Sequence, residues 1–212
     1  TLARELAKAL NYILIDSGAM YRAVALYFLK NQIPYNGPDS SLQLIEDTLE
    51  KINIDFVYNP ETGTQQTLLN GENVEGEIRK MYVADQASKI SMVSAVRRHL
   101  VKKQQDKGKS GGIVMDGRDI GTTVFPHAEL KLFMTADPKV RARRRQLELE
   151  AKGIIQDLES IQKSLEDRDY QDSHREDSPL RKADDAITID NSNLNKDEQF
   201  ELVLKLVREK LG

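Results

Sequence analysis

The segment Tyr12–Arg22, with the sequence YILIDSGAMYR, decides the fold that we expect for this chain. It begins with four largely aliphatic residues, and Asp16 and Gly18 follow them closely. A short apolar run that stops at Asp and Gly and leads into a longer apolar-faced segment is typical of a strand that passes into a helix. The segment therefore predicts a β-α unit with polar side chains at the turn between its two parts.

The same pattern recurs along the chain. Further aliphatic runs lie at residues 113–115, 130–134 and 186–189. Asp137 and Pro138 supply an N-cap and a first-turn proline for a helix over 139–151, and Asn195 precedes an amphipathic helix. Nearly continuous apolar strands are typical of a parallel sheet that is buried on both faces. We therefore predict an α/β domain in which right-handed crossovers place helices against a parallel sheet.

Two segments depart from this rhythm. Residues 54–69 predict two strands around a turn at Asn59–Gly63, so we expect a small, partly antiparallel insert over residues 53–92. The segment Thr1–Leu10 predicts a helix with no strand in front of it. Either the sheet starts with a helix or, as we expect, a strand and a turn stand upstream of Thr1.

Composition limits the classes of protein to consider. The chain has 212 residues with 31 Lys or Arg and 34 Asp or Glu, which gives a formal charge of -3. This length suits one large domain, or one domain with a small insert. No apolar run approaches the ~20 residues that cross a bilayer, so we expect a soluble, cytoplasmic protein with no membrane segment. The slight acidic excess argues against a general nucleic-acid binder.

Metal sites built on cysteine or histidine are not expected. The absence of cysteine excludes a disulfide scaffold and a cysteine-ligated metal. The three histidines, His99, His127 and His174, lie far apart in the sequence, which argues against a zinc site. The chemistry of this chain therefore depends on other residue types.

Carboxylates, glycines and arginines gather where the predicted strands end. Asp16–Arg22 follows one strand and Asp116–Gly121 follows another. Ligands in open α/β sheets bind at the carboxyl ends of the strands, and the planar fork of arginine fits phosphate oxygens. For either segment alone, a turn with a surface ion pair is the better interpretation. Together, at one edge of a sheet, they predict a site that handles phosphate.

Two helical stripes of charge support the phosphate site. The first consists of Arg141, Arg144 and Arg145, and the second of Arg168, Asp172 and Arg175. Guanidinium groups on one helical face repel one another unless an anion lies among them, although Glu148 could pair with the first stripe on a solvated face. The second stripe suits a salt-bridge ladder as well as it suits a ligand.

At this point the motifs resemble those of bacterial cytidylate kinases. The resemblance rests on Asp16–Arg22 (DSGAMYR), Gly71–Val74 with Glu77–Arg79, Asp116–Thr122 (DGRDIGT), and Arg168–Arg175 with Pro179-Leu180, in matching order over essentially the whole chain. It implies the P-loop nucleoside monophosphate kinase fold. On this basis we expect a core at 1–52, 93–138 and 177–212, a monophosphate-binding insert at 53–92, and a helical lid with flanking helices at 139–176.

One family motif is not among these residues. The glycine-rich Walker A loop, which ends in Gly-Lys and a hydroxyl residue, is not present in the sequence, and Thr1 looks like the residue that follows that Gly-Lys pair. We expect the loop to precede Thr1. Thr1 is then a candidate for binding the ATP cofactor.

The resemblance also implies a reaction and the residues that carry it. The family moves the γ-phosphoryl group of ATP, bound with Mg²⁺, to CMP or dCMP. The implied catalytic residues are Arg118, Arg141, Arg144, Arg145 and Arg175, of which Arg141 and Arg145 also contact ATP. The implied residues for the CMP phosphate are Arg22, Arg118 and Arg175; for cytosine, Ser17, Ser88, Arg97 and Asp119; and for ribose, Arg168 and Asp172. Asp116 would hold Mg²⁺ through water.

Other readings stay open at this stage. Another small-molecule kinase, for UMP, AMP or shikimate, would share most of these motifs. The arginines of 141–145 could belong to an RNA-binding protein, although no aromatic residues are interleaved with them and the net charge is negative. A catalytically inactive interaction module is a third reading. From the family we expect a monomer whose partners are small molecules, not nucleic acid or membrane.

Overall fold

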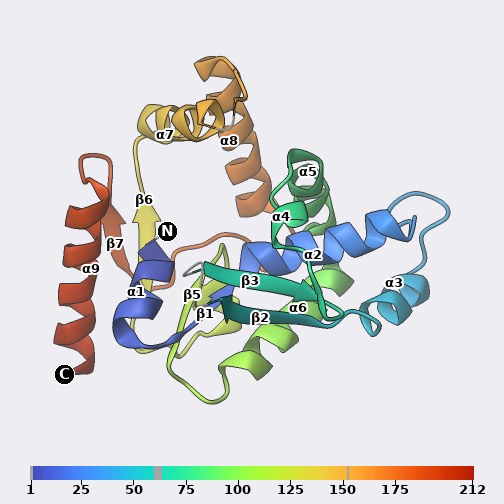
Figure 1. Cartoon of the computed structure of the whole chain (residues 1–212), viewed down its shortest axis with the longest axis horizontal. Helices are drawn as coiled ribbons and strands as arrows, with labels where there is room; N and C mark the ends of the chain where they lie inside the picture. Colours follow the sequence, from blue (N-terminus) through green and yellow to red (C-terminus); the bar gives the residue numbers. More distant parts are fainter. Residues whose placement is uncertain (1, 60–63, 152) are drawn as a thin grey trace. The chain divides into compact units, whose positions relative to one another are not determined.

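The computed structural model describes residues 2–59, 64–151 and 153–212. The chain forms two compact units. One is Ile13–Gly117, and the other joins the N-terminal residues through Tyr12 to Arg118–Gly212. Both units combine parallel strands with helices, which confirms the α/β prediction (Figure 1). The finer ranges expected for core, insert and lid stay a prediction.

The β-α unit predicted at the start of the sequence is present. Strand β1 (Ile13–Asp16) pairs in parallel with β5 (Ile113–Asp116), and helix α2 (Ser17–Lys30) follows β1 directly. The side chain of Asp16 accepts a hydrogen bond of 2.7 Å from the backbone N–H of Ala19 and so caps the helix. In the ladder, Asp16 stands opposite Asp116. The parallel register therefore places two carboxylates side by side at the ends of the strands.

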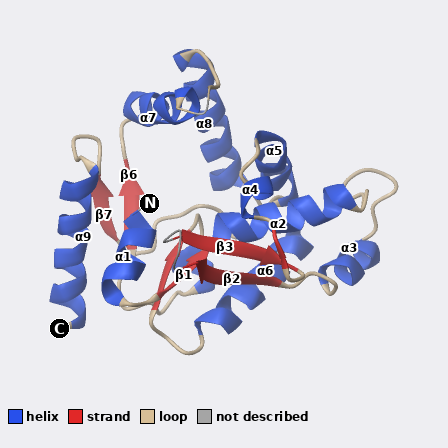
Figure 2. Ribbon diagram, in the orientation of Figure 1, coloured by secondary structure: helices blue, strands red, loops and turns tan. Residues whose placement is uncertain are grey.

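Helix α2 is the centre of the hydrophobic core in the unit Ile13–Gly117. Its buried side chains include Ala19, Met20, Ala23, Val24, Leu26 and Phe28. A helix that is apolar on nearly every side must be covered all round. Helix α2 packs most extensively against α5 (Met81–Ile90) and also contacts α6 (Ser94–Gly108), which in turn packs against α3 (Leu42–Leu49) (Figure 2). The core thus fixes the helix that begins at Ser17.

The antiparallel insert is also present. Strand β2 (Ile54–Asn59) pairs antiparallel with β3 (Thr64–Leu69), which pairs with the short β4 (Glu72–Asn73). Two residues in the left-handed region, Asn70 and Gly71, make the tight turn before β4. These strands confirm the expected hairpin, whose turn residues 60–63 lie outside the described residues. Helix α4 (Glu75–Ile78) follows at once.

The other unit contains the second parallel pair, β6 (Leu132–Thr135) with β7 (Ile187–Asp190). Helix α1 (Leu2–Leu10) packs against α9 (Lys196–Leu211), and α7 (Pro138–Glu150) packs against α8 (Leu158–His174). The predicted cap is confirmed at α7, where Asp137 caps the helix ahead of Pro138. The expected helix after Asn195 is also present, and the structure adds a capping box of Asn195 with Glu198 at its start. A single π-helical turn, η1 (Ile120–Val124), lies near the start of the unit.

One expectation about the strands is wrong. Met134 in β6 and Ile187 in β7 are 38% and 40% exposed, so this pair is not buried on both faces. Among the described residues this ladder has only two strands. The strand also begins at Leu132, two residues later than the apolar run suggested.

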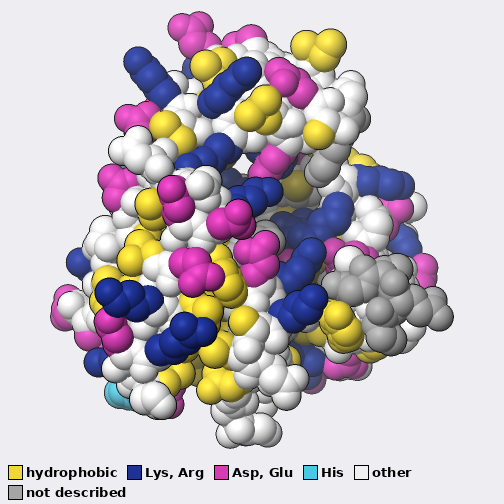
Figure 3. All heavy atoms as spheres, turned by 60° about the vertical axis from the view of Figure 1, so that its left-hand side comes forward, with side chains coloured by type: hydrophobic (Ala, Val, Ile, Leu, Met, Phe, Trp, Pro, Cys, Tyr) yellow, Lys and Arg dark blue, Asp and Glu magenta, His cyan; other side chains and the backbone are white. Residues whose placement is uncertain are grey.

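The surface reflects the balanced composition. On the face drawn in Figure 3, acidic and basic side chains are interspersed over much of the area. None of the helices in the described part of the chain has the length and apolar content needed to cross a membrane.

Candidate active site

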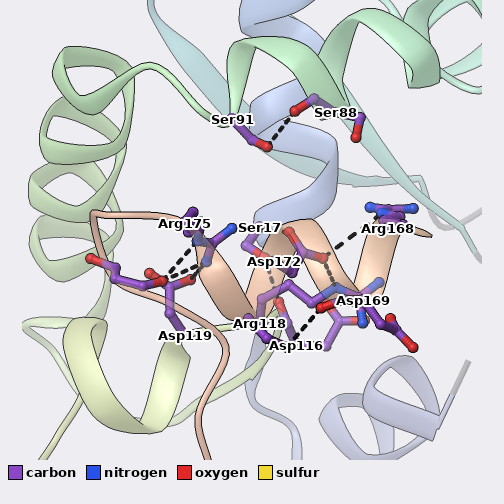
Figure 4. Close-up of polar contacts among 12 residues, drawn as sticks. Ser17, Ser88, Ser91, Asp116, Arg118, Asp119, Arg168, Asp169, Asp172 and Arg175 are labelled. Carbon is purple, nitrogen blue, oxygen red and sulfur yellow. Dashed lines mark hydrogen bonds and ion pairs between the residues drawn. The ribbon is translucent and has the colours of Figure 1, made fainter. Parts of the chain in front are cut away.

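The predicted site residues fall on both units. The unit Ile13–Gly117 carries Ser17, Arg22, Ser88, Arg97 and Asp116, and the other unit carries Arg118, Asp119, Arg141, Arg144, Arg145, Arg168, Asp172 and Arg175. Thr1, the remaining candidate, lies outside the described residues. Figure 4 shows many of the candidate residues as sticks.

The two aspartates at the strand ends form the first feature. Partial desolvation, together with the negative charge of Asp16 beside it, raises the pKa of Asp116 from 3.8 to about 6, although the residue is still exposed to solvent. Ser17 donates from its hydroxyl to the backbone carbonyl of Asp116 at 2.7 Å and so ties the start of α2 to the end of β5. The strand ends therefore carry an excess of negative charge that a cation would relieve.

Two arginines offset part of this negative charge. Asp16 forms ion pairs with Arg79 Nη2 at 3.0 Å and with Arg22 Nη2 at 3.7 Å. Burial works to raise the pKa of Asp16, but the backbone hydrogen bond from Ala19 and the two guanidinium groups outweigh it, so its pKa is lowered. A Cβ atom at Gly18 would lie 3.2 Å from the guanidinium of Arg22. The missing side chain thus leaves room for Arg22 to reach the carboxylate.

Arg79 also connects these strand ends to the antiparallel insert. Its Nε donates to Glu75 at 2.7 Å, and the other oxygen of Glu75 accepts from the hydroxyl of Thr67 at 2.6 Å and from its backbone N–H at 3.2 Å. Thr67 is buried in β3. A continuous chain of charge-assisted bonds therefore runs from Asp16 through Arg79 and Glu75 into the insert.

Ser88 and Arg97 meet through a third residue. The guanidinium of Arg97 is buried, donates to the backbone carbonyl of Ser91 at 3.3 Å, and lies 5.6 Å from the ring centre of Tyr21. The hydroxyl of Ser91 donates to the backbone carbonyl of Ser88 at 2.7 Å (Figure 4). The contact with Tyr21 holds Arg97 against α2, the helix that also carries Ser17 and Arg22.

A partly buried cluster of charge occupies the other unit, where three arginines surround two aspartates. Arg175 contacts Asp172 at 3.1 Å and Asp119 at 3.5 Å, while Arg118 contacts the second oxygen of Asp172 at 3.1 Å (Figure 4). Arg168 lies 4.0 Å from that same oxygen. The side chain of Arg175 is only 3% exposed and also donates twice to the carbonyl of Ser178, at 2.7 and 2.9 Å.

This cluster, from here the Asp172 cluster, comprises Arg118, Asp119, Arg168, Asp172 and Arg175. Three positive and two negative groups leave a net charge of +1. Burial and the neighbouring charge of Arg118 lower the pKa of Arg168, even though 53% of its side chain is exposed. Such crowding of like charges is relieved when an anion arrives. The structure shows Asp172 in the salt-bridge ladder that the sequence offered as one alternative, and ligand binding by these residues stays a prediction.

Asp119 owes its position to the π-helical turn. Its backbone carbonyl accepts from the N–H groups of Thr123 at 2.9 Å and Val124 at 3.4 Å, which begins η1. The side chain of Asp119 is buried, with Arg175 beside it. Single π-helical turns are frequent at functional sites because they aim a side chain that a regular helix would place elsewhere.

The three arginines of α7 have different partners. Arg141 pairs with Asp169 on α8, and Arg145 pairs with Glu148 at 3.1 Å while remaining 41% exposed. Arg144 donates to the side chain of Asn191 at 2.9 Å, to its carbonyl at 2.7 Å and to the carbonyl of Leu194 at 3.2 Å. Arg144 therefore anchors α7 to the loop after β7. Glu148, which the spacing offered to Arg144 or Arg145, is paired with Arg145.

Comparison with known proteins agrees with these motifs over the full length. The family model for cytidylate kinase matches residues 1–209. The chain is 51% identical over 212 residues to the cytidylate kinase of Parabacteroides distasonis, covering all of this chain and 92% of that protein. It is 54% identical over 201 residues to the cytidylate kinase of Bacteroides thetaiotaomicron (95% of this chain and 87% of that protein), and 51% identical over 210 residues to that of Flavobacterium johnsoniae (99% and 90%).

The chain belongs to the cytidylate kinase family. Among the candidate site residues, the structure adds some to which the sequence assigned no role. Asp16 and Arg79 belong to the motifs that carried the resemblance. Their ion pair joins positions 63 apart, and no local sequence pattern predicts it. The sequence also gave no indication that Asn191 accepts hydrogen bonds from Arg144. The N-cap that Asp16 makes explains the start of α2 and not the pairing with Arg79.

The raised pKa of Asp116 predicts how stability in this cytidylate kinase family member depends on pH. Because its pKa is raised to about 6 from the ordinary 3.8, the stability that protonated Asp116 contributes is complete below pH 3.8 and is lost as pH rises through 6. Asp116→Asn should therefore gain in Tm relative to the unsubstituted chain as pH goes from 4 to 7.

Thermal unfolding followed by circular dichroism, in buffer with EDTA, measures this difference. Asp184→Asn, at an exposed loop position, is the matched control and should give a difference that does not change with pH. A constant difference for Asp116→Asn across the same range would contradict the assignment of excess negative charge to the strand ends.

Proposed function

We propose that this chain is a cytidylate kinase, which transfers the γ-phosphoryl group of ATP to CMP or dCMP and forms ADP and CDP or dCDP. The observation that carries the proposal is the similarity to cytidylate kinases along the whole chain. The arrangement of arginines within each unit supports it. The acceptor oxygen is already anionic, so the reaction needs no general base, and the protein's task is to align two polyanions and spread the charge of the transferring group.

The proposed binding residues for the acceptor phosphate are Arg22, Arg118 and Arg175. Arg118 and Arg175 belong to the Asp172 cluster, whose net positive charge suits an incoming dianion. Arg22 has a weak ion pair of 3.7 Å with Asp16, and a phosphate would offer it a closer, doubly charged partner. Arginine keeps its positive charge at every working pH, so this clamp does not titrate.

We assign recognition of the cytosine base to Asp119 with Ser17, Ser88 and Arg97. A carboxylate accepts a hydrogen bond from the exocyclic amino group of cytosine and repels the carbonyl oxygen that uracil has in its place. Asp119 is held for this by η1 and by Arg175. Arg168 and Asp172, side by side on α8, are the proposed contacts of the ribose hydroxyls.

On the donor side we assign Arg141 and Arg145 to the ATP phosphates, with Arg144 as a third arginine of the same helix and Thr1 at the end of the phosphate loop. Mg²⁺ bound with ATP supplies charge neutralisation to the phosphates. Asp116 fits such an ion because carboxylate oxygen is the preferred ligand and its raised pKa marks local negative charge. In the described part of the chain no three His, Cys, Asp or Glu side chains gather around a metal position. Asp116 would therefore act through water, as is usual for Mg²⁺.

An assay of ADP release tests the proposal. The full-length protein, supplied with ATP and Mg²⁺, is offered CMP, dCMP, UMP, AMP and shikimate in turn. Rapid ADP release with CMP or dCMP, and slow release with the other three acceptors, is the expected result. Faster turnover of UMP, AMP or shikimate would assign the chain another acceptor, and no turnover with any of them would overturn the proposed activity.

Asp119→Ala should raise the KM for CMP about tenfold or more, because the cytosine amino group loses a charged acceptor. The preference for CMP over UMP should fall in parallel. Steady-state kinetics with both acceptors measures the two effects. Asp119→Asn is the matched variant: its amide can donate to the uracil carbonyl, so it should favour UMP relative to the alanine variant. Unchanged base preference in both variants would exclude Asp119 from base recognition.

Arg145→Ala should lower kcat about a hundredfold while changing the KM for CMP less than about threefold, because the lost charge is needed when the phosphoryl group transfers. Arg143→Ala is the control, since Arg143 lies on the same helix, is 58% exposed and pairs with the nearby Glu150 at 4.0 Å. Its kinetics should stay close to those of the unsubstituted chain. Equal losses in the two variants would mean that α7 contributes only general positive charge.

A further inference from the structure

Lys131 is a lysine whose side chain is almost buried and to which the proposed reaction assigns no role. It stands directly before β6, at the end of the loop that begins with η1, and its side chain is only 7% exposed. Lysine is rarely buried unless its charge is paired. The ammonium group donates to both carboxylate oxygens of Asp185, at 2.7 and 2.9 Å, and to the backbone carbonyl of Pro126. Lys131 therefore ties the loop after η1 to the segment before β7.

The aliphatic part of the same side chain lies against η1. A Cβ atom at Gly121, the second residue of η1, would lie 3.2 Å from Cδ of Lys131 and 3.5 Å from its Cγ. Carbon atoms pack best at about 3.5–4.0 Å, so the first of these contacts would be too close. The missing side chain at Gly121 therefore lets Lys131 approach the backbone of η1. Lys131 contacts η1 with its stem and holds Pro126, just beyond η1, with its ammonium group.

The loop that Lys131 holds has little apolar support of its own. The structure describes every residue from Ile120 to Leu130, and Val124 is the only buried residue among them. The backbone N–H of Phe125 donates to Ile120 at 2.8 Å, which closes η1 from within. Segments with few buried apolar contacts open more readily than the core of a protein. The polar bonds of Lys131 therefore matter more here than they would in a segment with a hydrophobic core.

Asp119 stands at the start of this loop. Its backbone carbonyl accepts a hydrogen bond of 2.9 Å from Thr123 in η1, and its buried carboxylate lies 3.5 Å from Arg175. The carboxylate is thus restrained at its oxygen atoms by Arg175 and at its backbone by η1. Movement of η1 would move the carboxylate relative to a bound base.

We propose that Lys131 is a positioning residue for base recognition, because it fixes η1 and thereby the place of the Asp119 carboxylate. This inference rests on the proposed function, in which Asp119 accepts a hydrogen bond from the amino group of cytosine. A group displaced by about 1 Å can lose much of its effect on a bound substrate. Because Lys131 acts through η1, its removal should reduce the preference for cytosine over uracil more than it weakens nucleotide binding in general.

Lys131→Met tests the proposal, since methionine keeps an unbranched side chain and removes the ammonium group. Amide hydrogen exchange of residues 119–126, measured on the full-length protein without nucleotide, should become about tenfold faster or more, because η1 opens more easily. Isothermal titration calorimetry with CMP and with UMP gives the base preference as the ratio of the two Kd values. This ratio should fall about fivefold or more.

Lys205→Met is the matched control. It removes the same charge from a lysine of α9 that is 73% exposed and pairs with Glu209 at 3.7 Å. Exchange of residues 119–126 and the ratio of Kd values should both stay close to those of the unsubstituted protein. A lysine that contributes only net charge would give the same result at both positions.

Asp185→Ala breaks the same interaction from its exposed partner, which is 64% exposed, and so provides a second variant if Lys131→Met folds poorly. It should change exchange and base preference in the same direction, whereas Asp184→Ala, at the adjacent exposed position, should change neither. Unchanged exchange of η1, or faster exchange with an unchanged ratio of Kd values, would overturn the proposal. An unsubstituted protein with no preference for CMP would instead contradict the proposed function, and the exchange measurement would still decide whether Lys131 fixes η1.

Discussion

The strand register that places Asp16 opposite Asp116 is the constraint on which much of the unit Ile13–Gly117 depends. The parallel register of β1 and β5 forces the two carboxylates together, and the hydrophobic core behind α2 prevents the strand ends from moving apart. Arg79 and Arg22 form ion pairs with Asp16, while the pKa of Asp116 is raised. Repulsion built in by backbone pairing thus draws cations to the strand ends.

The Asp172 cluster has the opposite sign. Its three arginines exceed its two aspartates, and Arg168 has a lowered pKa because like charges crowd it. Buried ion pairs of this kind contribute little net stability, since desolvation offsets most of their attraction. Holding surplus positive charge in a fixed geometry is instead suited to an anion that completes the cluster. For a kinase that must hold a dianionic acceptor, the surplus is an advantage.

The sequence predicted the local features well and the distant ones poorly. Short aliphatic runs, the Asp137-Pro138 cap and the helix after Asn195 depend on neighbouring residues, and all of them are present in the structure. The bond of Arg79 to Asp16 joins residues 63 positions apart, and that of Arg144 to Asn191 joins residues 47 apart. Hydrophobic periodicity carries no information on such pairs, because they arise only when helices dock.

Helical spacing places the three arginines of α7 on one face, but it could not predict that they have different partners. Arg144 donates to four acceptors in the 191–194 loop, so moving it would break bonds that position the helix itself. Arg141 is tied to α8 through Asp169. Arg145 has one exposed partner on its own helix, an interaction worth about 0.3–0.5 kcal/mol, and can exchange it for a phosphate at little cost. The proposed role of α7, to bring positive charge to the ATP phosphates, requires such a division, with one arginine fixing the helix and another able to leave its partner.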